Sequence, residues 1–333
     1  MSFWRGKKVL VTGGNGFIGS HVVELLVGTG ARVSITASSP ESNLSYVKAV
    51  RDDIRILYGD LRDATHCGAI TLGQDIVMNL AAKVGGISYN IAHPGSIFRD
   101  NLLIFMNVLE ASRKACVERF LVTSSACVYP RFCSIPTPES EGFEGRPEPT
   151  NEGYGWAKRM EEFLGDAYHR EFGMRIAIAR PYNAYGPRDN FDPESSHVIP
   201  GLIYRIYAGE NPLVVWGDGT HSRSFLYVKD FARGLMEVTE KYAESDAVNL
   251  GADEEVTIGD LARMLVELSG KQIEIVFDPS RPVGQPRRKC DTRKAREKVG
   301  FEARVPFPEG LAETLQWYER EVLAQATSGK NLL

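Results

Sequence analysis

The sequence lacks long hydrophobic runs and any large excess of one charge. Its 333 residues carry 39 basic and 43 acidic side chains, a net charge of −4, so the basic surface of a nucleic-acid-binding protein is not expected. No stretch approaches the roughly 20 apolar residues of a membrane-spanning helix. The apolar run that ends at Thr12 is also too short for a secretory signal. We therefore expect a cytoplasmic protein that binds neither nucleic acid nor membrane.

Cysteine is scarce, and its spacing is irregular. A disulfide framework needs paired cysteines, and a zinc site needs closely spaced ligands. The number here is odd and the spacing fits no metal site, so we predict reduced thiols and no metal. The five cysteines are Cys67, Cys116, Cys127, Cys133 and Cys290.

Glycine, in contrast, is concentrated in one turn near the beginning of the chain. Residues 8–12 form an apolar strand-like run, residues 13–19 read GGNGFIG, and residues 21–26 begin a helix-like stretch. Such glycines let the backbone approach a pyrophosphate at a helix N-terminus. A lone match could be an ordinary turn, but the flanking pattern is the one that dinucleotide binding requires. We predict cofactor contacts at Gly13, Gly16, Phe17, Ile18 and Gly19.

Strand-like and helix-like segments alternate along the first half of the chain. This alternation predicts an α/β fold with a Rossmann-like, doubly wound parallel sheet. The strand-like runs are residues 32–36, 54–58, 76–80, 119–123 and 175–179, and the candidate crossover helices are residues 43–50, 96–114 and 153–171.

The composition of the chain changes after Pro181, where Pro, Gly and loop residues become more frequent. We predict a helix at residues 258–268, a strand at 272–277 and a last helix near 308–318, followed by a frayed tail after Ala324. Residues 1–180 are therefore expected to form the NAD(P)-binding domain. Residues 181–325 are expected to form mainly a smaller C-terminal α/β substrate lobe, with some segments returning to the Rossmann sheet.

The choice of cofactor depends on the end of the second strand. An Asp or Glu there would bind the 2′-hydroxyl of NAD, but the chain has Ser38 and Ser39. Two hydroxyls accept a 2′-phosphate without repelling it, so NADP(H) is favoured and NAD(H) is the alternative. Asp60 and Leu61, at the end of the third strand, are candidates for the adenine side. Asp60 could equally be an ordinary turn aspartate.

Tyr154 and Lys158 lie four residues apart in a predicted helix, so they share one helix face. An ammonium beside a phenol favours the phenolate, and such a tyrosine can exchange a proton with a carbonyl or alcohol oxygen during hydride transfer. The spacing is common and would fit a solvated helix surface. Ser125, at the end of the fifth predicted strand, favours a catalytic pair over a solvated surface, because its hydroxyl can hold the same substrate oxygen.

Several longer segments resemble the extended short-chain dehydrogenase/reductases that act on nucleotide sugars, and among them the GDP-L-fucose synthase family. The likeness runs from the first strand to the last helix. Its motifs are AAKVGGI at residues 81–87, SSACVYP at 124–130, EPTNEGY at 148–154, YGPRDNFDP at 185–193, SHVIP at 196–200 and VWGDG at 215–219.

The resemblance implies NADPH-dependent epimerisation at C3 and C5 and reduction at C4 of a GDP-4-keto-6-deoxyhexose. Ser125, Tyr154 and Lys158 match the reductive triad. Cys127 matches the epimerisation base and His197 its partner acid, and both groups exchange protons near neutral pH. By themselves, Cys127 would be a small buried side chain as often as not, and His197 would be a structural histidine.

The predicted ligand is a nucleotide-diphosphate sugar. Paired hydrogen bonds from guanidinium groups suit its phosphates, although surface arginines are the ordinary alternative. Lys83 is expected to face the sugar, and Trp216 either stacks near the substrate or belongs to the core. The candidates for the diphosphate are Asn183, Arg205, Arg223 and Arg288.

Three departures from this family leave alternatives open. Ala126 stands where a serine is usual, which also resembles GDP-mannose 3,5-epimerase. Arg288 replaces a common lysine, and the Ser38–Ser39 turn lacks a phosphate-binding arginine. An epimerase without net cofactor consumption is therefore the alternative, and a dinucleotide sensor without chemistry is a remote one.

The resemblance also implies a homodimer, formed by the helices at residues 96–114 and 153–171. In related proteins the corresponding helices build a four-helix interface. The apolar residues of these helices could instead pack on the sheet. They include Leu102, Phe105, Leu109, Trp156 and Phe163.

Overall fold

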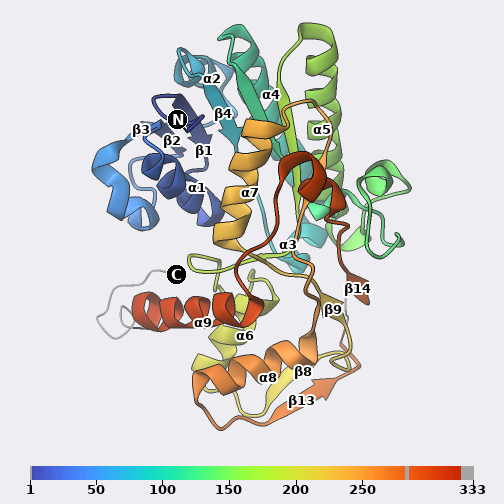
Figure 1. Cartoon of the computed structure of the whole chain (residues 1–333). Coiled ribbons are helices and arrows are strands. Elements are labelled where there is room, and N and C mark those ends of the chain that lie inside the picture. Colours follow the sequence, from blue (N-terminus) through green and yellow to red (C-terminus); the bar gives the residue numbers. More distant parts are fainter. Residues whose placement is uncertain (1, 282–284, 324–333) are drawn as a thin grey trace.

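The computed structural model describes residues 2–281 and 285–323, and its centre is a seven-stranded parallel sheet (Figure 1). The strand order is β11-β6-β5-β4-β1-β2-β3, which is the doubly wound arrangement predicted from the sequence. The strands are β1 (Lys8–Thr12), β2 (Arg32–Ala37), β3 (Ile54–Tyr58), β4 (Ile76–Asn79), β5 (Arg119–Thr123), β6 (Ile176–Pro181) and β11 (Val248–Leu250).

Alternation along each strand divides the core into two layers. Val9 and Val11 of β1 belong to the cluster formed with α1 (Phe17–Gly28) and α7 (Val228–Lys241). Leu10, on the opposite face, packs with α2 (Ala64–Thr71) and α4 (Pro94–Lys114). The helix α5 (Glu152–Phe172) lies beside α4. Both faces are therefore covered, as an all-parallel sheet requires.

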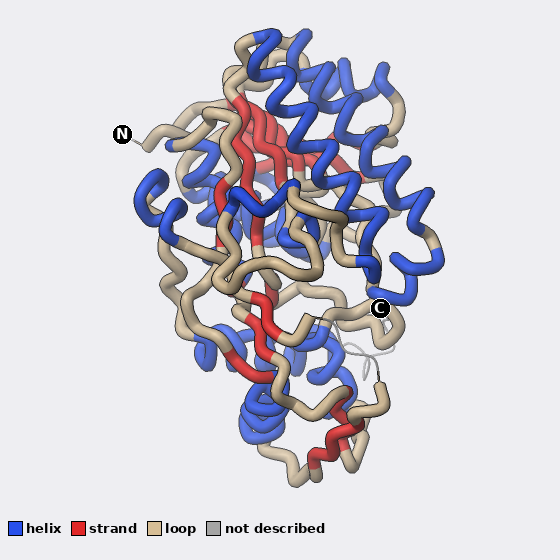
Figure 2. The backbone as a smooth tube through the Cα atoms, turned by 90° about the vertical axis from the view of Figure 1, so that its right-hand side faces the viewer, coloured by secondary structure: helices blue, strands red, loops and turns tan. Residues whose placement is uncertain are grey.

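A second group of elements packs below this sheet around a separate apolar cluster (Figure 2). It contains α6 (Val198–Tyr207), α8 (Ile258–Ser269), α9 (Phe307–Trp317) and a parallel pair of β8 (Leu213–Trp216) and β13 (Ile275–Asp278). The smaller elements are α3 (Ile87–Ala92), β7 (Ala184–Tyr185), β9 (Ser222–Arg223), β10 (Leu226–Tyr227), β12 (Val256–Thr257) and β14 (Arg287–Arg288).

The chain returns to the main sheet after residue 181, through α7 and β11. β11 pairs in parallel with β6, with Val248 opposite Ala179. The apolar side chains of α7, such as Phe231 and Leu235, join the same cluster as Val9 and Val11. Segments distant in sequence thus complete the sheet that carries the glycine turn.

Most predicted segments are confirmed, but one predicted α-helix is wrong. Residues 43–50 do not form a crossover helix. They overlap an irregular 3₁₀ segment, Ser45–Asp53, interrupted at Val50 with φ −120° and ψ 18°. Only Val47 is buried in it, so no apolar face stabilises a regular helix. α2, α7 and β11 were not predicted.

Within residues 2–281 and 285–323, no helix combines the length and hydrophobicity needed to cross a membrane. The same residues contain no group of three His, Cys, Asp or Glu side chains placed to hold a metal ion. The predicted frayed tail after Ala324 lies outside the described residues.

Candidate active site

The glycine turn leaves the N-terminus of α1 open to an anion. Gly13 has φ +67°, and a Cβ there would lie 3.0 Å from the Cα of Ala81. A Cβ on Gly19 would lie 2.1 Å from the carbonyl oxygen of Gly13. Gly16 caps the helix without a side chain, and the first turn carries no acidic residue. This backbone fits a pyrophosphate, because the helix dipole and the N–H groups of the first turn favour negative charge.

Two polar residues not predicted from the sequence fix the switch point between β1 and β4. The hydroxyl of Thr12 donates to Oδ1 of Asn79 at 2.8 Å and accepts from the N–H groups of Leu80 and Ala81, each at 3.0 Å. Both side chains are buried. Their only signal in the sequence is their position at the ends of two apolar strands, where open α/β sheets bind ligands.

The ends of β2 and β3 lie together beside this turn. The N–H of Gly59 donates to the carbonyl oxygen of Ala37 at 3.0 Å. Ser38 contacts the hydroxyl of Ser42 at 3.1 Å, and a hydrogen bond with Ser39 lowers the pKa of the nearby Glu41 carboxyl. The predicted ribose region is therefore a hydroxyl-rich turn with one acidic neighbour.

Asp60 has a partner that the sequence analysis missed. Arg62 donates to its carboxylate from Nη2 at 2.7 Å and from Nε at 3.0 Å, and this ion pair lowers the pKa of Asp60. Leu61 is buried, and its carbonyl oxygen accepts from the thiol of Cys67 at 3.2 Å. Arg62 is thus an exposed cation shortly after β3 that is paired with Asp60.

Tyr154 and Lys158 occupy one face of α5, as predicted. The ammonium of Lys158 lies 5.5 Å from the centroid of the Tyr154 ring. It donates to the carbonyl oxygen of Thr123 at 2.9 Å, which ties α5 to the carboxyl end of β5, and to Glu161 at 2.8 Å. Burial raises the pKa of Tyr154 to about 12, and Lys158 opposes this rise. The ammonium lowers the pKa of Tyr154, as expected, but burial raises this pKa by more.

Ser125 and Cys127 follow directly after β5. Ser125 begins the 3₁₀ turn Ala126–Val128, and its hydroxyl accepts from the N–H of Cys127 at 3.2 Å. The Cys127 thiol is partly exposed. The side-chain amide of Asn151 lies 3.0 Å from Sγ, and Nη2 of Arg288 lies at 4.0 Å. The thiol therefore has a polar donor and a cation as neighbours.

Close backbone approach holds this turn against α5. A Cβ on Gly155 would lie 2.5 Å from the carbonyl oxygen of Cys127, so a larger residue would separate the two elements. Asn151, immediately before α5, was not predicted. Because it precedes Tyr154 by three residues, the same segment positions the phenol and the amide that contacts Cys127.

Two arginines lie side by side on neighbouring strands of the second lobe. Arg223 of β9 is the register partner of Arg288 of β14. Among the described residues, neither forms an ion pair with a carboxylate. Burial and the Arg288 charge lower the pKa of Arg223 to about 10. Two adjacent guanidinium groups without a carboxylate are suited to a dianionic ligand.

His197 immediately precedes α6 and keeps an exposed surface. The surrounding protein and the Arg288 charge lower the pKa of its imidazole. Arg288 is therefore the electrostatic neighbour that Cys127, His197 and Arg223 share. The structure brings these four residues together from segments as far apart as residues 127 and 288.

The remaining predicted ligand residues have protein partners. Arg205 donates to Glu210 at 2.6 Å and to the carbonyl oxygen of Val214 at 2.6 Å. Lys83 donates to Asp100 at 3.0 Å. Asn183, in a positive-φ conformation, donates to the carbonyl oxygen of Ser224 at 2.7 Å, and Trp216 is 53% exposed beside the Arg281 guanidinium. Of this group, Arg205 has its donors directed away from the Arg288 cluster.

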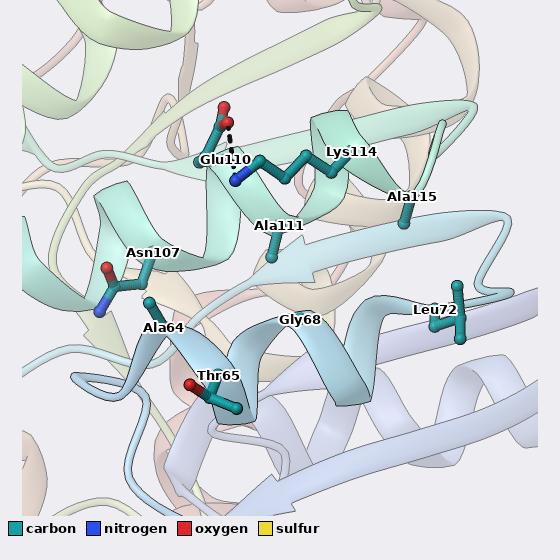
Figure 3. A pocket seen from close by; sticks show the side chains of 9 residues that line it. All are labelled: Ala64, Thr65, Gly68, Leu72, Asn107, Glu110, Ala111, Lys114 and Ala115. Carbon is teal, nitrogen blue, oxygen red and sulfur yellow. Dashed lines mark ion pairs between the residues drawn. The ribbon is translucent and has the colours of Figure 1, made fainter.

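Two well-formed hollows lie elsewhere on the molecule. A groove of about 270 Å³ runs between α2 and α4, lined by small residues and by the Glu110–Lys114 ion pair (Figure 3). A second hollow of about 460 Å³, lined by Phe98, Trp156 and Met160 among others, lies where α4 and α5 begin. Neither contains Cys127, Tyr154 or Arg288.

The fold and the Tyr154–Lys158 pair beside a glycine turn define an NAD(P)-dependent enzyme of the short-chain dehydrogenase/reductase type. The family model "NAD dependent epimerase/dehydratase family" matches residues 9–251. The chain belongs to this family.

Relatives of similar length agree with this assignment. A probable GDP-L-fucose synthase from Oryza sativa is 36% identical and covers 96% of this chain and 94% of that protein. GDP-L-fucose synthase from Escherichia coli is 34% identical, with coverages of 94% and 96%. A dTDP-4-dehydro-6-deoxy-D-allose reductase from Streptomyces bikiniensis is also 34% identical, with coverages of 95% and 97%. The family is shown, whereas the sugar differs among equally similar relatives.

Solved structures have the same fold over nearly the whole chain. An epimerase from Methanothermobacter thermautotrophicus is 29% identical with a TM-score of 0.87, and covers 98% of this chain and 96% of that one. A GDP-L-fucose synthetase from Naegleria fowleri bound to NADP is 28% identical with a TM-score of 0.80, and covers 96% and 94%.

We expect the Gly19→Ala substitution to weaken NADPH binding at least about tenfold, because its Cβ would displace the Gly13 carbonyl from the turn that receives the pyrophosphate. Titration calorimetry with NADPH measures this change. Gly28→Ala is the matched control, since a Cβ there meets nothing within 4 Å on the same helix. Equal affinities of the two variants would contradict this use of Gly19.

Proposed function

We propose that the protein epimerises C3 and C5 and reduces C4 of a GDP-4-keto-6-deoxyhexose with NADPH, giving GDP-L-fucose or a close analogue. The observation that carries this proposal is the Cys127 thiol, which lies between Asn151 and Arg288 within the same site as Tyr154 and Lys158. A reductase that leaves the carbon configuration unchanged has no need of a thiol base. The GDP-L-fucose synthase relatives add weight to this reading.

Each of the central residues has a separate chemical task in this proposal. Ser125 and Tyr154 hold and polarise the C4 oxygen, which acidifies the neighbouring carbon-bound protons. Cys127 removes such a proton and His197 delivers one to the opposite face. Bound NADPH would supply the hydride to C4. Tyr154 then donates its proton to the C4 oxygen, with Lys158 beside it.

The nucleotide sugar is proposed to lie between the two lobes, which correspond to residues 1–180 and mainly 181–325. Arg223 and Arg288 bind the diphosphate, because their charges are adjacent and lack carboxylate partners. Lys83, Asn183 and Trp216 stay predicted ligands of the sugar or nucleotide. Arg205 stays a prediction as well, although its bonds to Glu210 support a structural role instead.

NADP(H) is the proposed cofactor in preference to NAD(H). Ser38 and Ser39 offer hydroxyls where NAD-specific proteins place an acidic residue. Glu41, which hydrogen-bonds with Ser39, and Asp60, which binds Arg62, act in the opposite direction. The relative from Naegleria fowleri was solved with NADP bound.

Incubation with GDP-4-keto-6-deoxymannose and NADPH in deuterated water tests the proposal. We expect stoichiometric loss of NADPH absorbance and deuterium at both C3 and C5. Deuterium without NADPH loss would instead identify an epimerase that resembles GDP-mannose 3,5-epimerase. NADPH loss without deuterium would identify a simple 4-reductase, such as the name of the Streptomyces relative describes. Neither NADPH loss nor deuterium uptake would contradict this substrate, and other nucleotide sugars, GDP-mannose first, would be tested next.

We also propose a cytoplasmic homodimer that uses α4 and α5. Of the predicted interface residues, Phe105 and Leu109 are fully buried against the sheet and unavailable to a partner. Phe163 is 55% exposed, and Leu103 and Met106 of α4 are 39% and 47% exposed. Sedimentation at micromolar concentration should give twice the chain mass of 36.9 kDa. A monomeric mass would contradict the dimer.

A further inference from the structure

A carboxylate lies buried behind the ammonium of Lys158. Glu161 is 2% exposed and Lys158 3% exposed, and their charged atoms are 2.8 Å apart. The ammonium has three N–H donors. Glu161 and the carbonyl oxygen of Thr123 accept two of them, so the protein fixes the direction of the third.

This carboxylate changes the charge that Tyr154 experiences. An unpaired ammonium 5.5 Å from the ring centroid would favour the phenolate. The Glu161 carboxylate, in contact with that ammonium, lies within about 8 Å of the same ring and carries the opposite charge. The pair presents little net charge to the phenol, and Glu161 by itself favours the protonated form.

The other charged groups around the pair have their own partners or lie further away. Glu162 receives two hydrogen bonds from Arg180, at 2.8 and 2.7 Å. Cys127 faces Tyr154 from the turn after β5 and, as a thiolate, would also favour the protonated phenol. Arg288 lies on the far side of Cys127. Glu161 is thus the carboxylate that offsets Lys158 within the described residues.

We propose that Glu161 is a positioning residue that orients Lys158 and offsets its charge, so that the Tyr154 phenol keeps its proton to a higher pH than it would beside an unpaired ammonium, which is the form that ketone reduction needs. In this direction C4 accepts hydride from NADPH and its oxygen accepts the Tyr154 proton, giving the alcohol and NADP⁺. Alcohol oxidation would need Tyr154 as the phenolate base. The inference rests on the proposed function only in naming Tyr154 as the donor to that oxygen.

The test compares the parent protein with Glu161→Gln. The ultraviolet absorbance of tyrosinate is followed against pH, and subtracting the Tyr154→Phe curve isolates the Tyr154 transition in each background. We expect this transition to fall by roughly one pH unit or more in E161Q, because one negative charge near the phenol is removed. The high-pH limb of kcat/KM for reduction should move down equally.

Two further variants separate charge from general damage. Glu171→Gln makes the same charge change at an exposed position near the end of α5 and should leave the Tyr154 transition unchanged. Glu161→Asp keeps the charge and should restore the parent transition. An E161Q transition equal to or above that of the parent would overturn the proposal.

The titration needs no substrate, so it decides the role of Glu161 whatever sugar the protein uses. A shift as expected in a protein inactive on the proposed sugar would contradict the proposed function alone. If E161Q does not fold, the parent curve can still contradict the inference. A Tyr154 transition below the ordinary phenol value of about 10 in the parent would overturn the inference.

Discussion

Tyr154→Phe should lower the rate of NADPH oxidation by about 10²- to 10⁴-fold, the usual contribution of a general acid. The variant lacks the only proton that α5 directs at the proposed C4 oxygen, while the Lys158–Glu161 pair behind it is preserved. Deuterium exchange at C3 and C5 should fall much less, because Cys127 remains and Ser125 still polarises the ketone. The assay follows nicotinamide absorbance and deuterium content in the same sample.

Cys127→Ser is the complementary change and should suppress deuterium exchange first. A serine hydroxyl has a far higher pKa than a thiol and is a poor base at neutral pH. Cys116→Ser is the matched control, since Cys116 is exposed and precedes β5, whereas Ser125 and Cys127 follow the other end of that strand. If Tyr154→Phe and Cys127→Ser lost both activities to the same extent, the proposed separation of roles would be wrong.

Arg180→Met should destabilise the protein by about 3–5 kcal/mol, because it leaves a buried carboxylate without its partner. Arg180 is 3% exposed and donates twice to Glu162, at 2.8 and 2.7 Å. It also donates to the hydroxyl of Tyr129 at 3.0 Å and to the carbonyl oxygen of Glu139 at 2.7 Å. The free energy of unfolding is measured by denaturant titration.

The hydrogen-bond network around Arg180 also reaches the residue next to Ser125, so we expect Arg180→Met to disturb the site as well as to destabilise the protein. Glu162 also accepts a hydrogen bond from the hydroxyl of Ser124, adjacent to Ser125. Arg170→Met is the control, because Arg170 forms an exposed pair with Asp166 on the same helix and should cost under about 1 kcal/mol. Equal losses in the two variants would show that burial does not set the strength of the Arg180 pair.

The strands and the cofactor turn could be predicted because their signals are local. Residues 54–58 and 119–123 appear as β3 and β5 with the predicted bounds. The apolar run of β5 suits a strand buried on both faces, whereas β3 is a partly exposed edge strand. The glycine turn is recognisable from seven consecutive residues. The failure at residues 43–50 has a local cause too, because a short segment with one buried side chain gains little from packing.

Segments that depend on distant partners were harder to predict. β11 has three residues, and only its pairing with β6 makes it a strand of the main sheet. Asn151 lies within a quoted motif but was given no role, and Arg62 carried no motif. The importance of both follows from the atoms beside them, Cys127 Sγ and the Asp60 carboxylate. The sequence left open whether Phe105 and Leu109 face a partner or the sheet, because amphipathicity does not say what covers an apolar stripe, and the structure buries both against the sheet.

The sequence by itself determined the first six strands of the main sheet, the turn at Gly13–Gly19 and the one-turn spacing of Tyr154 and Lys158, because each depends on neighbours within about one helical turn or one strand. Only the tertiary structure decided which charges are free and which are neutralised. Arg205 and Arg288 look alike as residues, yet one binds Glu210 and the other lies beside Cys127. Electrostatic environment depends on distance and burial in space, and sequence separation does not encode either.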